Sequence, residues 1–172
     1  MMKKGMMIIA LLLTGVGAWA QQDAIDQYFS NLLEDENYTK VTISSKMFEL
    51  LMHVDAEDQE EQELLDTITK LKGMRMLVKD EVGDGTKDYQ DAVRKIKGNY
   101  EVLMTVDDND EDMTFYIAEE NGTINELLMV LGGKQSFLIM SLVGDIDLNQ
   151  IAKLSRTLDI QGMENLQQLE DK

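Results

Sequence analysis

Three aspartates at alternate positions, Asp108, Asp110 and Asp112, form the most suggestive arrangement of chemical groups in the sequence. Together with Glu119 they match positions one, three, five and twelve of a calcium-binding loop. Position six of such a loop needs glycine for its sharp turn, but here it is Met113, and the residues that follow alternate like a strand. We therefore predict that this acidic loop joins two strands as a hairpin, and keep a weak calcium-responsive site as an alternative.

His53 is the only histidine, and Ser44 and Ser45 precede it closely enough for a nucleophile and its base to be considered. No G-x-S-x-G elbow surrounds either serine. A hydrolase that uses His53 is kept as a third alternative, and zinc binding through this single histidine would need other ligand types. The sequence therefore predicts no catalytic, cofactor-binding or metal-binding residues, no enzyme activity and no cofactor.

Other suggestive patterns have structural explanations. Gly83 and Gly85 follow a predicted strand and open a helix, but a third glycine and a Walker lysine are missing, which indicates a turn. The acidic run 55–63 suits the positive end of a helix dipole and is interpreted as a solvated face. Methionines on the predicted strands are interpreted as core residues rather than copper(I) ligands: Met74, Met76, Met104, Met113 and Met129.

The charge of the chain limits its partners. The formal net charge is -17, so phosphate backbones and anionic headgroups are repelled, and we expect neither nucleic-acid binding nor direct electrostatic membrane binding. The chain contains no cysteine, which excludes disulfides, thiol catalysis and thiolate metal sites. Cationic partners remain electrostatically favourable.

The first twenty residues predict an exported protein. Lys3 and Lys4 precede a short apolar run, and Ala18-Trp19-Ala20 offers the small-x-small pattern that signal peptidase requires. The apolar run is too short to span a bilayer. We expect cleavage between Ala20 and Gln21 and a soluble periplasmic or secreted product, without a lipid anchor because no cysteine follows the cleavage site.

Hydrophobic periodicity predicts alternating helices and strands in the rest of the chain. Two strands, 124–131 and 136–143, are apolar on both faces and should be central in a sheet. Asn121-Gly122 predicts a type I′ hairpin, and Gly132-Gly133 predicts a further turn. The remaining predicted elements are helices over 23–34, from Ser45, over 64–71, over 87–97 and from Asp147, with strands over 40–44, 73–79, 100–106 and 113–118.

Runs of consecutive hairpins after an α/β start predict the α+β class, with a mostly antiparallel sheet of about six strands packed with helices. We expect one domain over residues 21–156. The apolar pattern weakens afterwards, so residues 157–172 are predicted to be a partly helical tail.

Several segments resemble the DUF4252 family of exported Bacteroidetes proteins. They are the leader, residues 41–48 (VTISSKMF), residues 100–104 (YEVLM) and residues 144–148 (GDIDL). The resemblance implies an envelope location and a single α+β domain, and it implies no activity because the family is uncharacterised. Members with a lipobox cysteine are presented as lipoproteins, and this chain departs from them.

These observations together predict a non-catalytic, exported envelope protein that binds another protein or a peptide and has a regulatory role. Its partner is expected in the cell envelope, and the two-sided apolar strands could also pair with a second copy of the chain.

Overall fold

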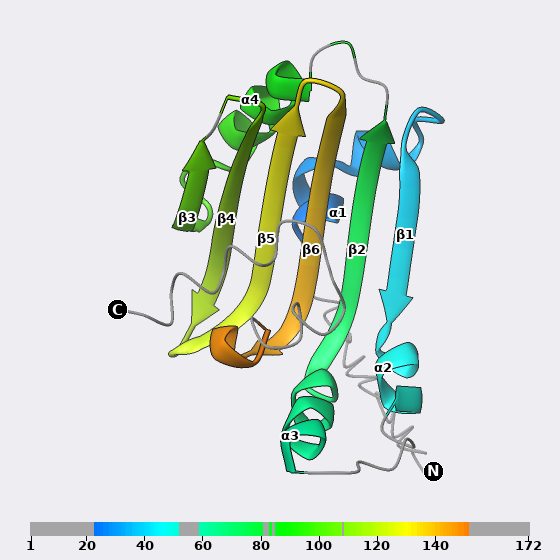
Figure 1. The fold of residues 1–172 in the computed structure, drawn as a ribbon, viewed down its shortest axis with the longest axis vertical. Helices are drawn as coiled ribbons and strands as arrows, with labels where there is room; N and C mark the ends of the chain where they lie inside the picture. The colour runs from blue at the N-terminus through cyan, green and yellow to red at the C-terminus, as the bar shows by residue number, and fades with distance from the viewer. Residues whose placement is uncertain (1–22, 52–58, 81–82, 84, 108, 152–172) are drawn as a thin grey trace, which may run out of the picture.

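A six-stranded antiparallel sheet organises the computed structural model, which describes residues 23–51, 59–80, 83, 85–107 and 109–151. The strand order is β1-β2-β6-β5-β4-β3 (Figure 1). The α+β class and the six-stranded, antiparallel sheet predicted from the sequence are thus confirmed. The strands are β1 (Thr39–Ser44), β2 (Leu71–Asp80), β3 (Glu101–Asp107), β4 (Glu111–Glu120), β5 (Thr123–Gly133) and β6 (Ser136–Ile146).

Helices cover one face and one end of this sheet. Figure 1 shows α1 and α4 behind the strands, and α2 and α3 beyond their lower ends. A short 3-10 helix, η1, follows α1 directly. The bounds are α1 (Ala24–Tyr28), η1 (Ser30–Leu33), α2 (Ser45–Leu51), α3 (Gln59–Ile68) and α4 (Gly85–Ile96).

The two faces of the sheet carry separate apolar clusters. The first face packs against α1, η1 and α4, and its buried residues are Ala24, Ile25, Phe29, Tyr38, Leu77, Ala92, Ile96, Tyr116, Leu128, Val130, Phe137 and Ile139. The second face carries Phe48, Ile68, Leu71, Met113, Phe115, Ile117, Leu127, Met129, Leu131, Met140, Leu142, Ile146 and Ile151.

Apolar residues on both faces explain why β5 and β6 are central, as the sequence predicts. Successive side chains of a strand point to opposite faces, so a central strand that is covered on both sides loses the usual alternation of apolar and polar residues. Within β6, for example, Ile139 belongs to the first face and Met140 to the second.

The two predicted glycine turns have different outcomes. Asn121 and Gly122 have φ values of 55° and 81°, which confirms the hairpin between β4 and β5. The turn predicted at Gly132-Gly133 is wrong, because both glycines continue β5 and pair with β4. A Cβ atom at Gly132 would lie 2.4 Å from Tyr89 Cβ and 2.5 Å from the Gly85 carbonyl oxygen. The glycine is therefore needed where α4 crosses the sheet closely.

Two predicted helices also have different bounds in the structure. The single helix expected over 23–34 is α1 followed by η1, and it changes at Phe29, where φ is -127° and ψ is 16°. Phe29 is buried on the first face, so packing overrides the helical pattern there. The helix expected over 64–71 ends at Ile68, and Leu71 begins β2 opposite Gly144.

Several predictions concern residues that the structure does not describe. These are the leader and its cleavage site within residues 1–22, His53 and the tail over 157–172. They stay predictions, as does the domain boundary at residue 156. In the ranges that the structure describes, no helix is long and apolar enough to cross a membrane.

Candidate binding pocket

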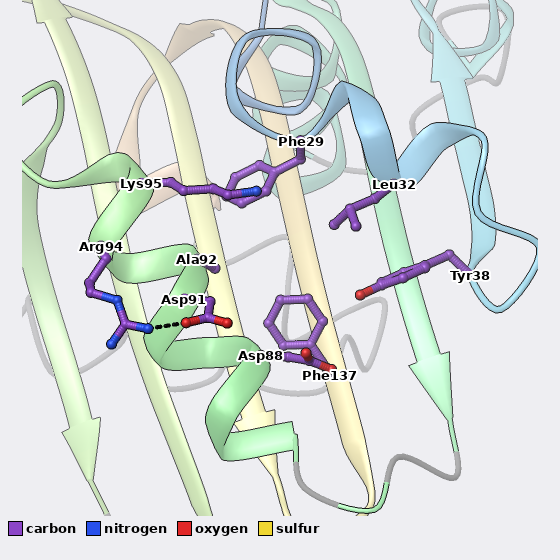
Figure 2. A pocket seen from close by; sticks show the side chains of 9 residues that line it. All are labelled: Phe29, Leu32, Tyr38, Asp88, Asp91, Ala92, Arg94, Lys95 and Phe137. Carbon is purple, nitrogen blue, oxygen red and sulfur yellow. Dashed lines mark hydrogen bonds and ion pairs between the residues drawn. The ribbon is translucent and has the colours of Figure 1, made fainter.

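A pocket of about 420 Å³ opens on the first face between η1 and α4. It lies over β6 and beside the segment that enters β1. Figure 2 shows Leu32 and Tyr38 facing α4 across the rings of Phe29 and Phe137. The pocket is thus built by segments from both halves of the chain, and α4 supplies one wall.

The floor of the pocket is aromatic and apolar. Phe29, Ala92 and Phe137 are all buried, and Phe29 holds its position at the junction of α1 and η1. The Tyr38 and Phe137 rings meet edge to face, with centroids 6.3 Å apart and an interplanar angle of 82°. Such contacts fix the orientation of the rings, so the floor is preformed.

The rim carries charges of both signs. Arg94 and Asp91 form an ion pair on the exposed side of α4 (Figure 2). Lys95 Nζ lies 5.5 Å from the centroid of the Phe29 ring, close enough for a cation–π contact. Asp88, about one turn earlier in α4, forms an ion pair with Lys79, and its Oδ2 lies 3.0 Å from Lys79 Nζ. The rim can therefore contact polar groups on either side of an apolar ligand group.

Tyr38 contributes a hydroxyl that points into this space (Figure 2). Burial, and then the negative charges of Asp88 and Asp35, raise the pKa of Tyr38 to about 12. Lys79 Nζ lies 5.5 Å from the ring centroid. The phenol is therefore protonated at neutral pH and can donate a hydrogen bond, and it forms none with any residue that the structure describes.

The lining combines apolar, hydroxyl and charged groups. Among the described residues that line the pocket there is no serine, cysteine or histidine, the common nucleophiles and bases of hydrolysis. The two carboxylates of the wall, Asp88 and Asp91, each pair with a cation. What the pocket offers is an apolar floor, one hydroxyl donor and a mixed rim.

A second pocket, of about 330 Å³, lies where α1 meets β1 and β2. Arg75 Nη1 is 3.1 Å from Asp23 Oδ2 and 2.7 Å from Asp26 Oδ1. Asp23 also caps α1, accepting a hydrogen bond from the Asp26 amide at 2.9 Å. These charged groups satisfy one another and attach α1 to β2, so we interpret this pocket as structural.

A buried carboxylate lies deeper on the first face. Glu126 accepts hydrogen bonds from the Ala24 amide at 2.8 Å, from the Tyr100 hydroxyl at 2.6 Å and from the Ser141 hydroxyl. Burial raises the pKa of Glu126, although these hydrogen bonds act in the opposite direction. With Glu126 only 4% exposed and Ser141 fully buried, the group is closed to a substrate and connects α1, β5, β6 and Tyr100, the residue before β3.

The acidic loop forms the hairpin that the sequence predicts. β3 ends at Asp107 and β4 begins at Glu111, and Asp110 forms an ion pair with Lys134. Asp108 is outside the described residues. Within the described ranges, no group of three His, Cys, Asp or Glu side chains is placed to hold a metal ion.

The serine and glycine candidates lie at the ends of regular elements. Ser44 ends β1 and Ser45 begins α2, while His53 is outside the described residues. Gly85 is the first residue of α4, and a Cβ there would lie 2.1 Å from the Ser136 carbonyl oxygen. Close packing against the β5–β6 hairpin accounts for this glycine, which agrees with the structural interpretation of the Gly83–Gly85 pair.

Sequence reasoning missed the pocket. The apolar stripe of α4 was recognisable from Tyr89, Val93 and Ile96, yet Ala92 and Lys95 beside it gave no separate signal. The pocket is lined by both Phe29 and Phe137, which are far apart in sequence. The tertiary fold places them on one face of the sheet, and hydrophobic periodicity alone does not predict that arrangement.

The family model described as "Domain of unknown function (DUF4252)" matches residues 28–154. The match includes η1, α4, every strand of the sheet and all of the residues that line the pocket between η1 and α4. No curated protein and no solved structure matches the chain.

Proposed function

The chain belongs to the DUF4252 family, whose description assigns no activity, and we propose from the geometry that it is a non-catalytic binding protein. Its partner is a peptide or an exposed protein segment that inserts one aromatic or branched aliphatic side chain between η1 and α4. The observation that carries this proposal is the preformed aromatic floor beneath a hydroxyl donor and a charged rim. A volume of about 420 Å³ is within the usual range for ligand pockets.

The charge of the chain selects among such segments. Because the formal net charge is -17, the long-range field attracts cationic segments and repels acidic ones. Asp88 and Asp91 place carboxylates beside the apolar floor. A preferred segment therefore has a central Phe, Leu or Ile flanked by Lys or Arg. An exported, envelope location would expose the pocket to such segments of other envelope proteins.

Calorimetric titration with short capped peptides tests this function. The probes are Lys-Lys-Phe-Lys-Lys, its Ala-centred analogue and Glu-Glu-Phe-Glu-Glu. We expect the first to bind most tightly, since only it combines the anchor with complementary charge. Equal binding of the Ala-centred peptide would contradict an apolar anchor.

Matched variants then locate the site. Leu32→Trp fills the pocket and should weaken binding at least about tenfold, or about 1.4 kcal/mol. Val102→Trp is the control, because Val102 is an exposed apolar residue on β3 outside the pocket lining. Likewise, Lys95→Glu should alter peptide affinity, whereas Lys97→Glu, beyond the end of α4, should alter it less. Equal effects of the paired variants would rule out this pocket as the site.

A further inference from the structure

The two edges of the sheet differ in what they offer to a further strand. In the part of the chain that the structure describes, every inner strand has two neighbours, so β1 and β3 each keep one unpaired edge. The register of β3 shifts between Val102 and Met104, as it does at a bulge. Glu101 and Asp107 place exposed carboxylates at its two ends. Bulges and charges are the usual devices that keep an edge from pairing with another chain, so β3 is protected.

Strand β1 has neither form of protection. Its residues pair with β2 in continuous register from Thr39 to Ser44, and five of the six are exposed. Residues 37–48 (NYTKVTISSKMF) include no acidic residue, although the chain carries 33. Lys40 is the one charged residue of the strand, and its Nζ lies 2.6 Å from the Asp35 carbonyl oxygen, toward the turn that precedes β1. Among the described residues no strand occupies this edge, so the outward N–H and C=O groups of alternate residues can bond a further antiparallel strand.

Exposed apolar side chains gather at the same edge. Of the four large hydrophobic residues that are exposed in the described ranges, three lie in β1 and α2, namely Val41, Met47 and Leu50. The strand register aligns Val41 in one row with methionines of the next three strands: Met76, Met140 and Met129. Met129 and Met140 are buried on the second face, whereas Val41 at the outer end of the row is 37% exposed. A strand added at β1 would therefore continue the row and cover Val41.

We propose that β1 pairs in the antiparallel direction with β1 of a second copy of the chain, which joins the two sheets into one. Two-fold pairing of identical strands places one residue opposite its own counterpart, and Val41 and Thr42 are the two central residues of β1. The contact uses the unpaired edge of β1 in both copies. Because β3 is protected, assembly ends at the dimer.

The charges at the two ends of β1 favour a second copy in this orientation. The preceding turn, residues 34–36 (EDE), is acidic, whereas Lys46 and Lys72 lie at the other end of the strand, where Figure 1 shows α2. Antiparallel pairing brings the acidic turn of each copy beside the lysines of the other. Lys46 also contacts Glu49 of its own chain at 2.7 Å, so these contacts orient the pair more than they add affinity.

The size and the net charge of the interface indicate a weak dimer. The net charge of -17 repels a second copy at long range, but salt at physiological strength screens this repulsion beyond about 8 Å. One pair of short strands buries less surface than a standard interface of about 1,600 Å². We therefore expect an equilibrium between monomer and dimer that shifts with concentration.

Disulfide cross-linking locates the contact, because the natural chain contains no cysteine. The chain is expressed with its leader and purified in the form that the cell produces. Opposed residues of antiparallel strands have Cα atoms about 4.5–5.5 Å apart, within reach of a disulfide. We expect Val41→Cys or Thr42→Cys to form a linked dimer with oxidised glutathione. Val102→Cys is the matched control, an exposed valine on the opposite edge, and should stay monomeric.

Sedimentation velocity over the micromolar to millimolar range measures the association itself. The natural chain should reach twice the chain mass at high concentration and dissociate on dilution. Val41→Lys places a charge at the centre of the paired strands and should weaken dimerisation at least about tenfold, whereas Val102→Lys should leave it unchanged. Circular dichroism melting of dilute samples reports whether each variant is folded. If Val41→Lys unfolds, the cross-linking result alone decides.

Other results would overturn the proposal. If the edge receives a strand of a different protein, the natural chain stays monomeric at every concentration. If a dimer forms through another surface, the Val41 and Val102 variants behave alike in both experiments. None of these substitutions changes a residue that lines the pocket between η1 and α4, so either failure leaves peptide binding at that pocket unaffected.

Discussion

The two faces of this sheet are held by different kinds of contact. The first face is rich in aromatic residues and directional hydrogen bonds, such as Tyr89 with Thr114 at 2.7 Å and Tyr100 with Glu126 at 2.6 Å. Methionine is missing from the first-face cluster among the described residues, whereas six methionines belong to or pack against the second. Directional contacts hold helices in one arrangement, while methionines adjust to what covers them. A preformed pocket accordingly lies on the first face and an adaptable surface on the second.

The largest expected difference comes from truncating one buried residue on each face. Phe137→Ala should lower the free energy of unfolding by about 3–5 kcal/mol, since rigid neighbours cannot fill the cavity. Met140→Ala, on the same strand, should be near the lower end of about 2–5 kcal/mol because Met76 and Met129 can move into the space. Urea denaturation measures both. A larger cost for Met140→Ala would reverse the contrast between the faces.

A smaller loss is expected from removing the buried carboxylate of the first face. Glu126→Leu removes the acceptor of the Ala24 amide and of the Tyr100 and Ser141 hydroxyls. The hydroxyls can rotate toward other acceptors, so the main cost is the buried amide left unsatisfied, about 1–3 kcal/mol. Glu126→Gln keeps one acceptor oxygen and is the control, expected to unfold at a higher urea concentration than Glu126→Leu. Equal midpoints would show that the hydrogen bonds contribute little.

The same residue makes stability depend on pH. Burial raises the pKa of Glu126 above its ordinary value of 4.5 in the folded chain. A raised carboxyl pKa favours the folded state fully below the ordinary value, and this contribution is lost as pH rises through the raised value. Glutamine does not titrate, so the melting temperature of Glu126→Gln, measured relative to that of the natural chain, should rise as the pH is raised from 4 to 7. A constant difference across this range would contradict the assigned cause.

The smallest effect is expected from conservative exchange on the second face. Met129→Leu conserves volume and should cost less than about 1.5 kcal/mol. Ala92→Leu, which adds volume to the tightly packed first face, should cost about 1–3 kcal/mol. Thermal denaturation compares the two. If Met129→Leu is the more damaging exchange, the second face is packed as specifically as the first.

Local pattern was sufficient for most elements of the sheet. Strand alternation and the Asn121-Gly122 pair located the hairpins, and apolar residues on both faces identified β5 and β6 as central. Each of these signals involves residues close together in sequence or the period of one strand. The predictions failed where tertiary packing changes a local preference: Phe29 interrupts a helix, and Gly132 continues a strand.

The candidate site depended on information that one sequence does not contain. Glu126 stands in an apolar strand, and only the pairing of β5 with β6 brings Ser141 to it. Phe29 and Phe137 similarly line one pocket only because α1 and β6 adjoin on one face. The methionines of the strands were correctly interpreted as packing residues, but their alignment in one row required the strand register.

The strand order also sets how the chain can fold. β3, β4, β5 and β6 are joined by successive hairpins, so their pairing closes only short loops and should be early. β2 must then return to β6 across α4 and three strands, a closure with a much larger entropy cost. Until it does, the outer backbone edge of β6 is open, and a second nascent chain could pair with it. Folding speed at this one edge therefore determines how long the chain is vulnerable to aggregation.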